Sequence, residues 1–189
     1  MISDKLIQQA KELVYSDAEK FGAPAFFHIE LANEKGRELA KKLNADEKIV
    51  LLGTLLMDCM LGAARKQGRL AKHIEMSVKK AEKLLSEFTD ITEKEKENVL
   101  QCVKQHHGSD KFYSIESEIC CNADCYRFLS IEGVIGGIGG FHEMPIDKVV
   151  DLFLQKADEK WNALSLAICK KELEPQYKLV KKFLSQFNA

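Results

Sequence analysis

Residues 49–64 read IVLLGTLLMDCMLGAA, which is the most apolar stretch of the 189-residue chain. The stretch is shorter than the ~20 residues that a membrane-spanning helix needs, and Asp58 interrupts it. The N-terminal sequence MISDKLIQQAKELVYS lacks the uninterrupted apolar run of a secretory signal. We therefore interpret residues 49–64 as a helix at the centre of a globular core, and we expect neither export nor a membrane partner.

The rest of the chain is also expected to be helical, because apolar residues recur at helical spacing and no stretch alternates with the period of a strand. The length and the 46% hydrophobic content predict one all-α domain over residues 1–189. The expected helices cover residues 3–20, 28–43, the segment after an Asp46 cap, 70–85, a segment opened by TDITEKE and ended by HHGSD, 114–128, 145–171, and 175 onward. Glycine-rich residues 133–140 are expected to form a turn or a site of close packing.

The charges of the chain balance, since 28 Lys and Arg residues and 29 Asp and Glu residues give a formal net charge of −1. A duplex nucleic acid partner is not expected, because such partners are bound by a basic excess. Six cysteines in a chain without an export signal favour free thiols in a reducing cytoplasm over a disulfide framework. Four aromatic residues at helical spacing predict either core or the face of a homodimer: Trp161, Tyr177, Phe183 and Phe187.

Asp58 is the first candidate functional residue, because a carboxylate in a buried helix costs several kcal/mol unless it is paired or binds a metal. Four further polar residues lie toward the apolar sides of their helices: His28, His73, His106 and Asp124. Any one of them alone is best explained as a core residue satisfied by a backbone carbonyl or a water. Together, on five successive helices, they would converge at the centre of a bundle, where nitrogen and oxygen ligands suit a first-row divalent ion. His107 is turned ~100° away from this apolar side.

In sequence order these five residues resemble the pattern H…HD…H…H…D of the HD-domain phosphohydrolase superfamily. The surrounding segments resemble that family too: FHIELANEKGRELAKKL its first-ligand helix, LLGTLLMDCMLGAA its central LLHD helix, HIEMSVKKAEKLL its HxxxS helix, VLQCVKQHHG the segment ending in the next histidine, and SEICCNADCYRFLSIEGVIGGIGGF its DADRLDAIGAIGIARTF-like region. The resemblance covers about residues 20–141. It implies the family's α-helical bundle, with the helices of residues 145–189 packed on it.

The resemblance implies two metal sites that share Asp58. The first would be formed by His28, Asp58 and Asp124, and the second by Asp58, His73 and His106. A divalent ion there, such as Mn, Fe, Zn, Co, Ni or Mg, would polarise a phosphoryl oxygen and lower the pKa of a bound water. Asp58, His73 and His106 are the expected catalytic residues, because either histidine, where it is not a ligand, would contact the phosphate or protonate the leaving oxygen.

A basic segment lies just before His73 and contains Arg65 and Lys72, with Lys66 and Arg69 between them. Arg65 and Lys72 are the candidates for binding the phosphate of a substrate. The alternative is a solvated loop, since charge clusters at helix ends are usually solvated.

The sequence departs from the family at the HD doublet, where Met57 replaces the histidine. A thioether is a poor substitute for imidazole on the metals that this family uses. Asn122 replaces the first aspartate of DAD, and Arg127 stands where an aspartate usually follows. Two functions therefore remain: a metal-dependent hydrolase acting on a small phosphorylated metabolite or nucleotide with weakened activity, or an inactive HD-fold protein that binds such a ligand in a regulatory role.

Overall fold

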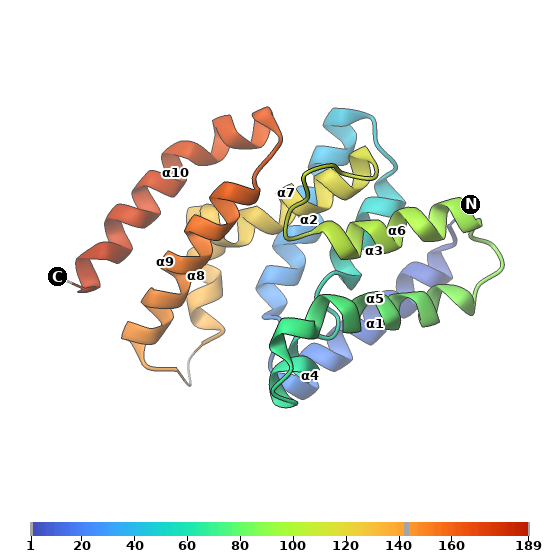
Figure 1. Cartoon of the computed structure of the whole chain (residues 1–189), viewed down its shortest axis with the longest axis horizontal. Helices are drawn as coiled ribbons and strands as arrows, with labels where there is room; N and C mark the ends of the chain where they lie inside the picture. The colour runs from blue at the N-terminus through green and yellow to red at the C-terminus, as the bar shows by residue number, and fades with distance from the viewer. Residues whose placement is uncertain (1, 142–143, 189) are drawn as a thin grey trace.

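The computed structural model describes residues 2–141 and 144–188, and within them all regular secondary structure is helical (Figure 1). The helices are α1 (Asp4–Phe21), α2 (Phe26–Leu43), α3 (Glu47–Leu56), α4 (Leu61–Lys66), η1 (Leu70–Lys72), α5 (His73–Ser86), α6 (Glu93–Gln105), α7 (Ile115–Leu129), α8 (Ile131–Gly139), α9 (Ile146–Ala163), α10 (Ala167–Ser185) and η2 (Gln186–Asn188). The all-α prediction is confirmed.

The predicted helix starts agree with the structure where a side chain caps the helix. The side chain of Asp46 accepts hydrogen bonds from the first backbone N–H groups of α3, and Ser3 caps α1 in the same way. Thr92 and Ser114 form capping boxes at α6 and α7. Each cap satisfies N–H groups that have no partner inside the helix, and the residues involved are at most three positions apart. The sequence alone is therefore enough to place the start of such a helix.

Residues 49–64 were predicted as one helix, and the structure corrects this to two helices joined by a turn at residues 57–60. The backbone N–H of Met60 has left the helical ladder and donates to Ser77 Oγ of α5 at 3.2 Å. This bond to a residue 17 positions away stabilises the turn, which carries Asp58. In the part of the chain that the structure describes, none of the helices is long and apolar enough to cross a bilayer.

The C-terminal helices also differ from the prediction, because the break lies at residues 164–166 and Pro175 lies inside α10. Buried Asn122 of α7 explains the position of the break. Its Oδ1 accepts hydrogen bonds from the backbone N–H groups of Ser165 and Leu166 at 3.3 and 3.1 Å. A side chain distant in sequence thus satisfies the backbone N–H groups of the two residues just before α10, and this partner outweighs the tendency of proline to open a helix.

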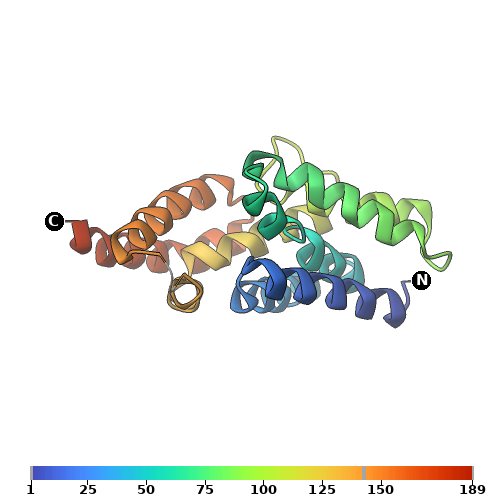
Figure 2. The ribbon, with the colours of Figure 1, turned by 90° about the horizontal axis from the view of Figure 1, so that it is seen from below.

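Helix α7 lies at the centre of the molecule, in contact with α2, α3, α6, α8, α9 and α10. Figures 1 and 2 place α9 and α10 at one end of the molecule and α1 and α5 at the other. Because α7 contacts α9 and α10 as well as α2, α3 and α6, the polar side chains that it buries can meet residues from both parts of the molecule. The candidate functional site lies beside α7.

The glycine-rich segment forms α8, and the expectation of close packing is confirmed. A Cβ atom added at Gly133 would lie 2.4 Å from the carbonyl oxygen of Tyr126, and one at Gly137 would lie 2.3 Å from Nε2 of His28. Both distances are far inside van der Waals contact, so only glycine lets α8 approach α2 and α7 this closely.

Two of the four aromatic residues near the C-terminus pack against the core, and the other two are exposed. The rings of Trp161 and Tyr177 stack with centroids 4.7 Å apart, and both pack against the core. Phe183 and Phe187 are 53% and 55% exposed.

Candidate metal and phosphate site

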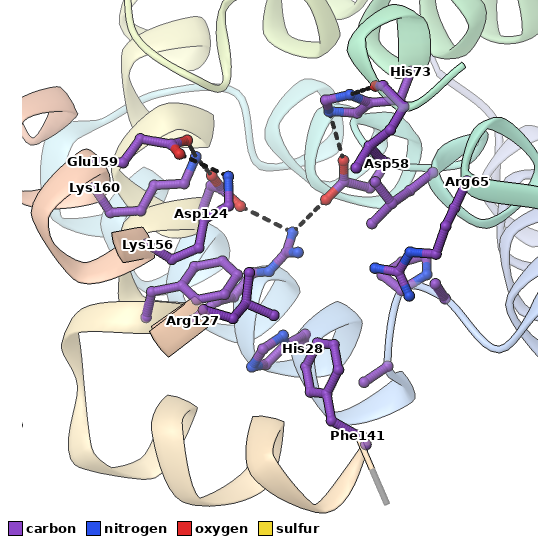
Figure 3. Close-up of a pocket in the computed structure, with 18 of the residues that line it drawn as sticks. His28, Asp58, Arg65, His73, Asp124, Arg127, Phe141, Lys156, Glu159 and Lys160 are labelled. Atoms are coloured by element: carbon purple, nitrogen blue, oxygen red, sulfur yellow. Dashed lines mark hydrogen bonds and ion pairs between the residues drawn. The ribbon is translucent and has the colours of Figure 1, made fainter. Parts of the chain in front are cut away.

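A cavity of about 650 Å³ opens beside α7 and is the centre of the candidate site. Its wall includes five residues predicted to be functional: His28, Asp58, Arg65, His73 and Asp124 (Figure 3). His106 is fully buried and does not line the cavity, but it contacts Asp58 from behind. Lys72 is exposed and lies outside the lining. The structure therefore brings the predicted ligands together and leaves Lys72 apart.

The prediction placed one functional residue within each of five helices, and this is wrong for two of them. Asp58 lies in the turn between α3 and α4, and His106 follows the last residue of α6 as its C-cap, whereas His73 lies in α5 as its first residue. Helix ends leave backbone carbonyls without helical partners, and a nearby imidazole can donate to them.

The tautomers of two histidines follow from such bonds. Nδ1 of His73 lies 2.8 Å from the carbonyl oxygen of Leu70, and Nδ1 of His106 lies 2.7 Å from that of Val103. Since a carbonyl only accepts, each Nδ1 carries a proton, and in the neutral form of each ring the lone pair is on Nε2. A protein holds metal-binding histidines in the same way, with the distal N–H fixed by a carbonyl.

The Nε2 atoms of these two histidines converge on one carboxylate oxygen. Asp58 Oδ1 lies 3.6 Å from Nε2 of His73 and 3.5 Å from Nε2 of His106. Neither Asp58 Oδ1 nor His106 Nε2 has a hydrogen-bond partner among the described residues, although both atoms are buried. With both rings neutral, these buried atoms are acceptors that face one another, which is costly, and a cation would satisfy them together. This donor set fits a divalent metal ion.

His107 joins the same cluster, and the sequence analysis missed it. One ligand atom from each of Asp58, His73, His106 and His107 lies within 4.8 Å of the others. Burial, followed in importance by the neighbouring His106, lowers the pKa of His107 to about 3, so the ring is neutral at physiological pH as a ligand must be. The helical-wheel argument failed because α6 ends at Gln105, before the wheel reaches His107. The HH doublet itself was the available signal.

The other predicted metal site contains a guanidinium. Nη1 of Arg127 lies 2.8 Å from Asp58 Oδ2 and 2.9 Å from Asp124 Oδ1, so it bridges the two carboxylates (Figure 3). His28 is engaged elsewhere, with Nε2 at 3.0 Å from the carbonyl oxygen of Gly133. Residues His28, Asp58 and Asp124 meet at one cavity, but their arrangement does not fit a metal ion between them.

Lys160 of α9 completes the charge balance of the buried site. Its Nζ contacts Asp124 Oδ2, and the side chain is almost fully buried. Burial alone would raise the pKa of Asp124, yet Lys160 and then Arg127 outweigh it and hold that pKa well below its usual range. Burial would raise the pKa of Asp58 as well, and the guanidinium of Arg127 likewise holds it down. Both carboxylates are therefore ionised at neutral pH.

The outer wall of the cavity combines cationic and apolar groups. Arg65 is exposed at the wall, and Lys156 of α9 lines it 2.7 Å from Glu159. Phe128 and Phe141 supply aromatic surface. A phosphate would find positive charge here, and an organic group attached to it would find apolar contact.

Acid is expected to destabilise the protein partly through His28. Burial, then the nearby Arg127, lowers the pKa of His28 to about 4, whereas the unfolded residue titrates near 6.5. Between these values the unfolded chain binds a proton that the folded chain does not, so stability falls as pH falls from 6.5 to 4, by about 3 kcal/mol from this group. Urea unfolding in chelator at pH 7 and pH 4 measures the loss.

The variant His28→Gln isolates this contribution, because its amide can still donate to Gly133 but does not titrate. The wild type is expected to lose ~2–3 kcal/mol more than the variant between the two pH values. Equal losses would show that His28 is not held in its neutral form.

Comparison of the sequence with protein-family models and with curated proteins finds no match in either case. Solved structures do match. A predicted HD superfamily hydrolase from an uncultured Thermotogales bacterium is 16% identical with a TM-score of 0.68, over 95% of this chain and 90% of that one. An HD-superfamily hydrolase from Bacillus thuringiensis is 20% identical with a TM-score of 0.60, over 97% and 95%. YpgQ from Bacillus subtilis, solved in complex with ADP, is 17% identical with a TM-score of 0.62, over 97% and 94%. The resemblance found in the sequence is confirmed at the level of the fold, and this chain has the fold of the HD-superfamily hydrolases.

Proposed function

We propose that this protein is a metal-dependent phosphohydrolase that acts on a small phosphorylated metabolite or nucleotide. The observation that supports the proposal is the convergence of Asp58 Oδ1 with Nε2 of His73 and Nε2 of His106 at a cavity with cationic walls, while Nδ1 of each ring is fixed by a backbone carbonyl. Neither Asp58 Oδ1 nor His106 Nε2 has a hydrogen-bond partner in the described chain, and a metal ion would satisfy both.

Asp58, His73, His106 and His107 would hold the ion. A set of one carboxylate and several imidazoles favours Zn, Fe, Co, Ni or Mn over Mg, which prefers oxygen ligands. When bound, a divalent ion supplies a polarised phosphoryl oxygen and a water of lowered pKa. Arg127 keeps Asp58 ionised, and exposed Arg65 and half-buried Lys156 would orient the phosphate as cations on the wall.

A nucleotide is the substrate class that the cavity suits best. Its volume of about 650 Å³ lies within the range of small-molecule sites. The rings of Phe128 and Phe141 would contact a base while the cationic wall contacts phosphate. YpgQ of Bacillus subtilis, which shares the fold, has been solved with ADP.

A second candidate function is binding of a phosphorylated ligand without hydrolysis, in a regulatory role. The observation that favours it is Arg127, which occupies the space between Asp58 and Asp124 and leaves the chain with a reduced set of metal positions. Met57, which is fully buried and stands where the family has a histidine, also favours binding without hydrolysis.

Hydrolysis is expected only in the presence of a divalent metal. Protein purified without a histidine tag would be analysed for metal content and then assayed on nucleotides and phosphate monoesters with Mn²⁺, Zn²⁺, Co²⁺, Ni²⁺, Fe²⁺ or Mg²⁺. Phosphate release should disappear in chelator and return when the metal is restored. Turnover that persists in chelator contradicts the proposal, and nucleotide binding by calorimetry without any turnover favours the second candidate.

The remaining features of the proposal concern the whole chain. We place residues 1–189 in one domain, supported by the contacts of α9 and α10 with α7. A reducing cytoplasm is supported by six buried free cysteines. A homodimer through the exposed aromatic side chains of Phe183 and Phe187 is the alternative to a monomer.

A further inference from the structure

We propose that Arg127 is a built-in cation that takes the place of a metal ion between Asp58 and Asp124, and that removing its guanidinium opens a metal site there. The inference goes beyond the proposed function, because it concerns a position at which the wild-type protein would bind no ion. It also explains how a chain can keep two buried acidic residues together without the histidine that Met57 replaces.

The geometry of the contact supports this role. A single nitrogen, Nη1 of Arg127, lies 2.8 Å from one carboxylate and 2.9 Å from the other, and the carboxylates come from the 57–60 turn and from α7. An ion at the position of Nη1 would need each oxygen to move by less than ~1 Å to reach a normal metal–oxygen distance of ~2.1 Å. The two carboxylates are thus already placed around a cation, and the cation is a side chain.

Charge gives an independent argument. Among the described residues, the buried members of the Asp, Glu, Lys and Arg classes are Asp58, Asp124, Arg127 and Lys160. Arg127 supplies the positive charge that Asp58 and Asp124 share, and Lys160 pairs with Asp124 and, at 3.6 Å, with Glu159. A divalent ion placed between Asp58 and Asp124 would lie against the guanidinium of Arg127 in a desolvated space, which is unfavourable, whereas the same ion after loss of Arg127 would replace the missing positive charge.

In the wild type, His28 is not a ligand candidate for an ion between Asp58 and Asp124, because its ring is held by other residues. Its Nε2 donates to Gly133, and Gly137 lies so close that a Cβ there would touch the ring. The imidazole therefore has a partner away from the carboxylates. We expect an ion in an Arg127 variant to be held first by Asp58 and Asp124, with water completing its coordination.

The test compares Arg127→Ala with Lys160→Ala, in full-length protein without a histidine tag. Each variant removes one buried cation from Asp124, but only Arg127 also touches Asp58. Equilibrium dialysis against Mn²⁺ followed by elemental analysis gives the ions bound per chain, and thermal unfolding gives the shift in Tm on adding Mn²⁺. Arg127→Ala is expected to bind one ion more than the wild type and to gain more in Tm, while Lys160→Ala matches the wild type.

Equal stoichiometry in the wild type and Arg127→Ala overturns the inference, and so does an extra ion in Lys160→Ala. A wild type that binds no ion contradicts the proposed function, yet one extra ion in Arg127→Ala would still support the role of Arg127, so the two failures are distinguishable. If Arg127→Ala does not fold, Arg127→Gln keeps an amide donor toward the carboxylates without the charge. The same extra ion is expected in Arg127→Gln, and its absence overturns the inference.

Discussion

Asp58→Ala is expected to lower kcat/KM for phosphate release by roughly 1,000-fold or more, which corresponds to about 4 kcal/mol of transition-state stabilisation. Asp58 Oδ1 is the atom on which both His73 and His106 converge, so its loss removes the anionic member of the proposed metal site. The measurement is steady-state hydrolysis of the best nucleotide substrate with saturating metal, together with metal content of the purified variant.

Asp58→Asn is the matched control, because it keeps the shape of the side chain and an oxygen for Arg127. If Asp58 acts through its charge on a metal, Asn should be nearly as inactive as Ala while unfolding closer to the wild-type temperature. Activity retained by both variants would show that the chemistry lies elsewhere in the protein.

Asp124→Leu is expected to reduce the free energy of unfolding by about 3–5 kcal/mol, since it leaves the buried charge of Lys160 with only the more distant carboxylate of Glu159, at 3.6 Å. Lys160 contacts Asp124 directly and is 1% exposed, so water does not replace the lost carboxylate. Arg127 keeps its contact with Asp58 in this variant. Urea unfolding at pH 7 in chelator measures the effect without any contribution from bound metal.

Two controls separate a buried charge from a lost contact. The double variant Asp124→Leu with Lys160→Met removes both charges and should recover most of the stability. Asp158→Leu breaks a 2.7 Å ion pair with Lys181 and an exposed hydrogen bond from the Tyr177 hydroxyl on the surface, and should cost no more than ~1 kcal/mol. A similar cost for the buried and the surface substitutions would mean that the ion pair of Asp124 and Lys160 is not desolvated in solution.

The fold class and most helix starts were predictable from sequence, because they depend on short-range physics. Apolar residues three and four positions apart define the buried face of a helix, and caps such as Thr92 with Glu95 are complete within three residues. The order of His28, Asp58, His73, His106 and Asp124 was sufficient to indicate the fold. The prediction was wrong where a partner distant in sequence determines the end of a helix, as at the 57–60 turn and at the break that Asn122 stabilises.

The sequence by itself determined that this protein is an all-α chain with several histidines and acids at buried positions. Only the tertiary structure decided how those charges are shared: Arg127 between Asp58 and Asp124, Lys160 on Asp124, and His107 in the metal cluster. The physical reason is that burial and charge pairing depend on distances between elements up to 69 residues apart in the chain. A lysine or arginine that is bound in the interior has the same one-letter code as one that is solvated at the surface.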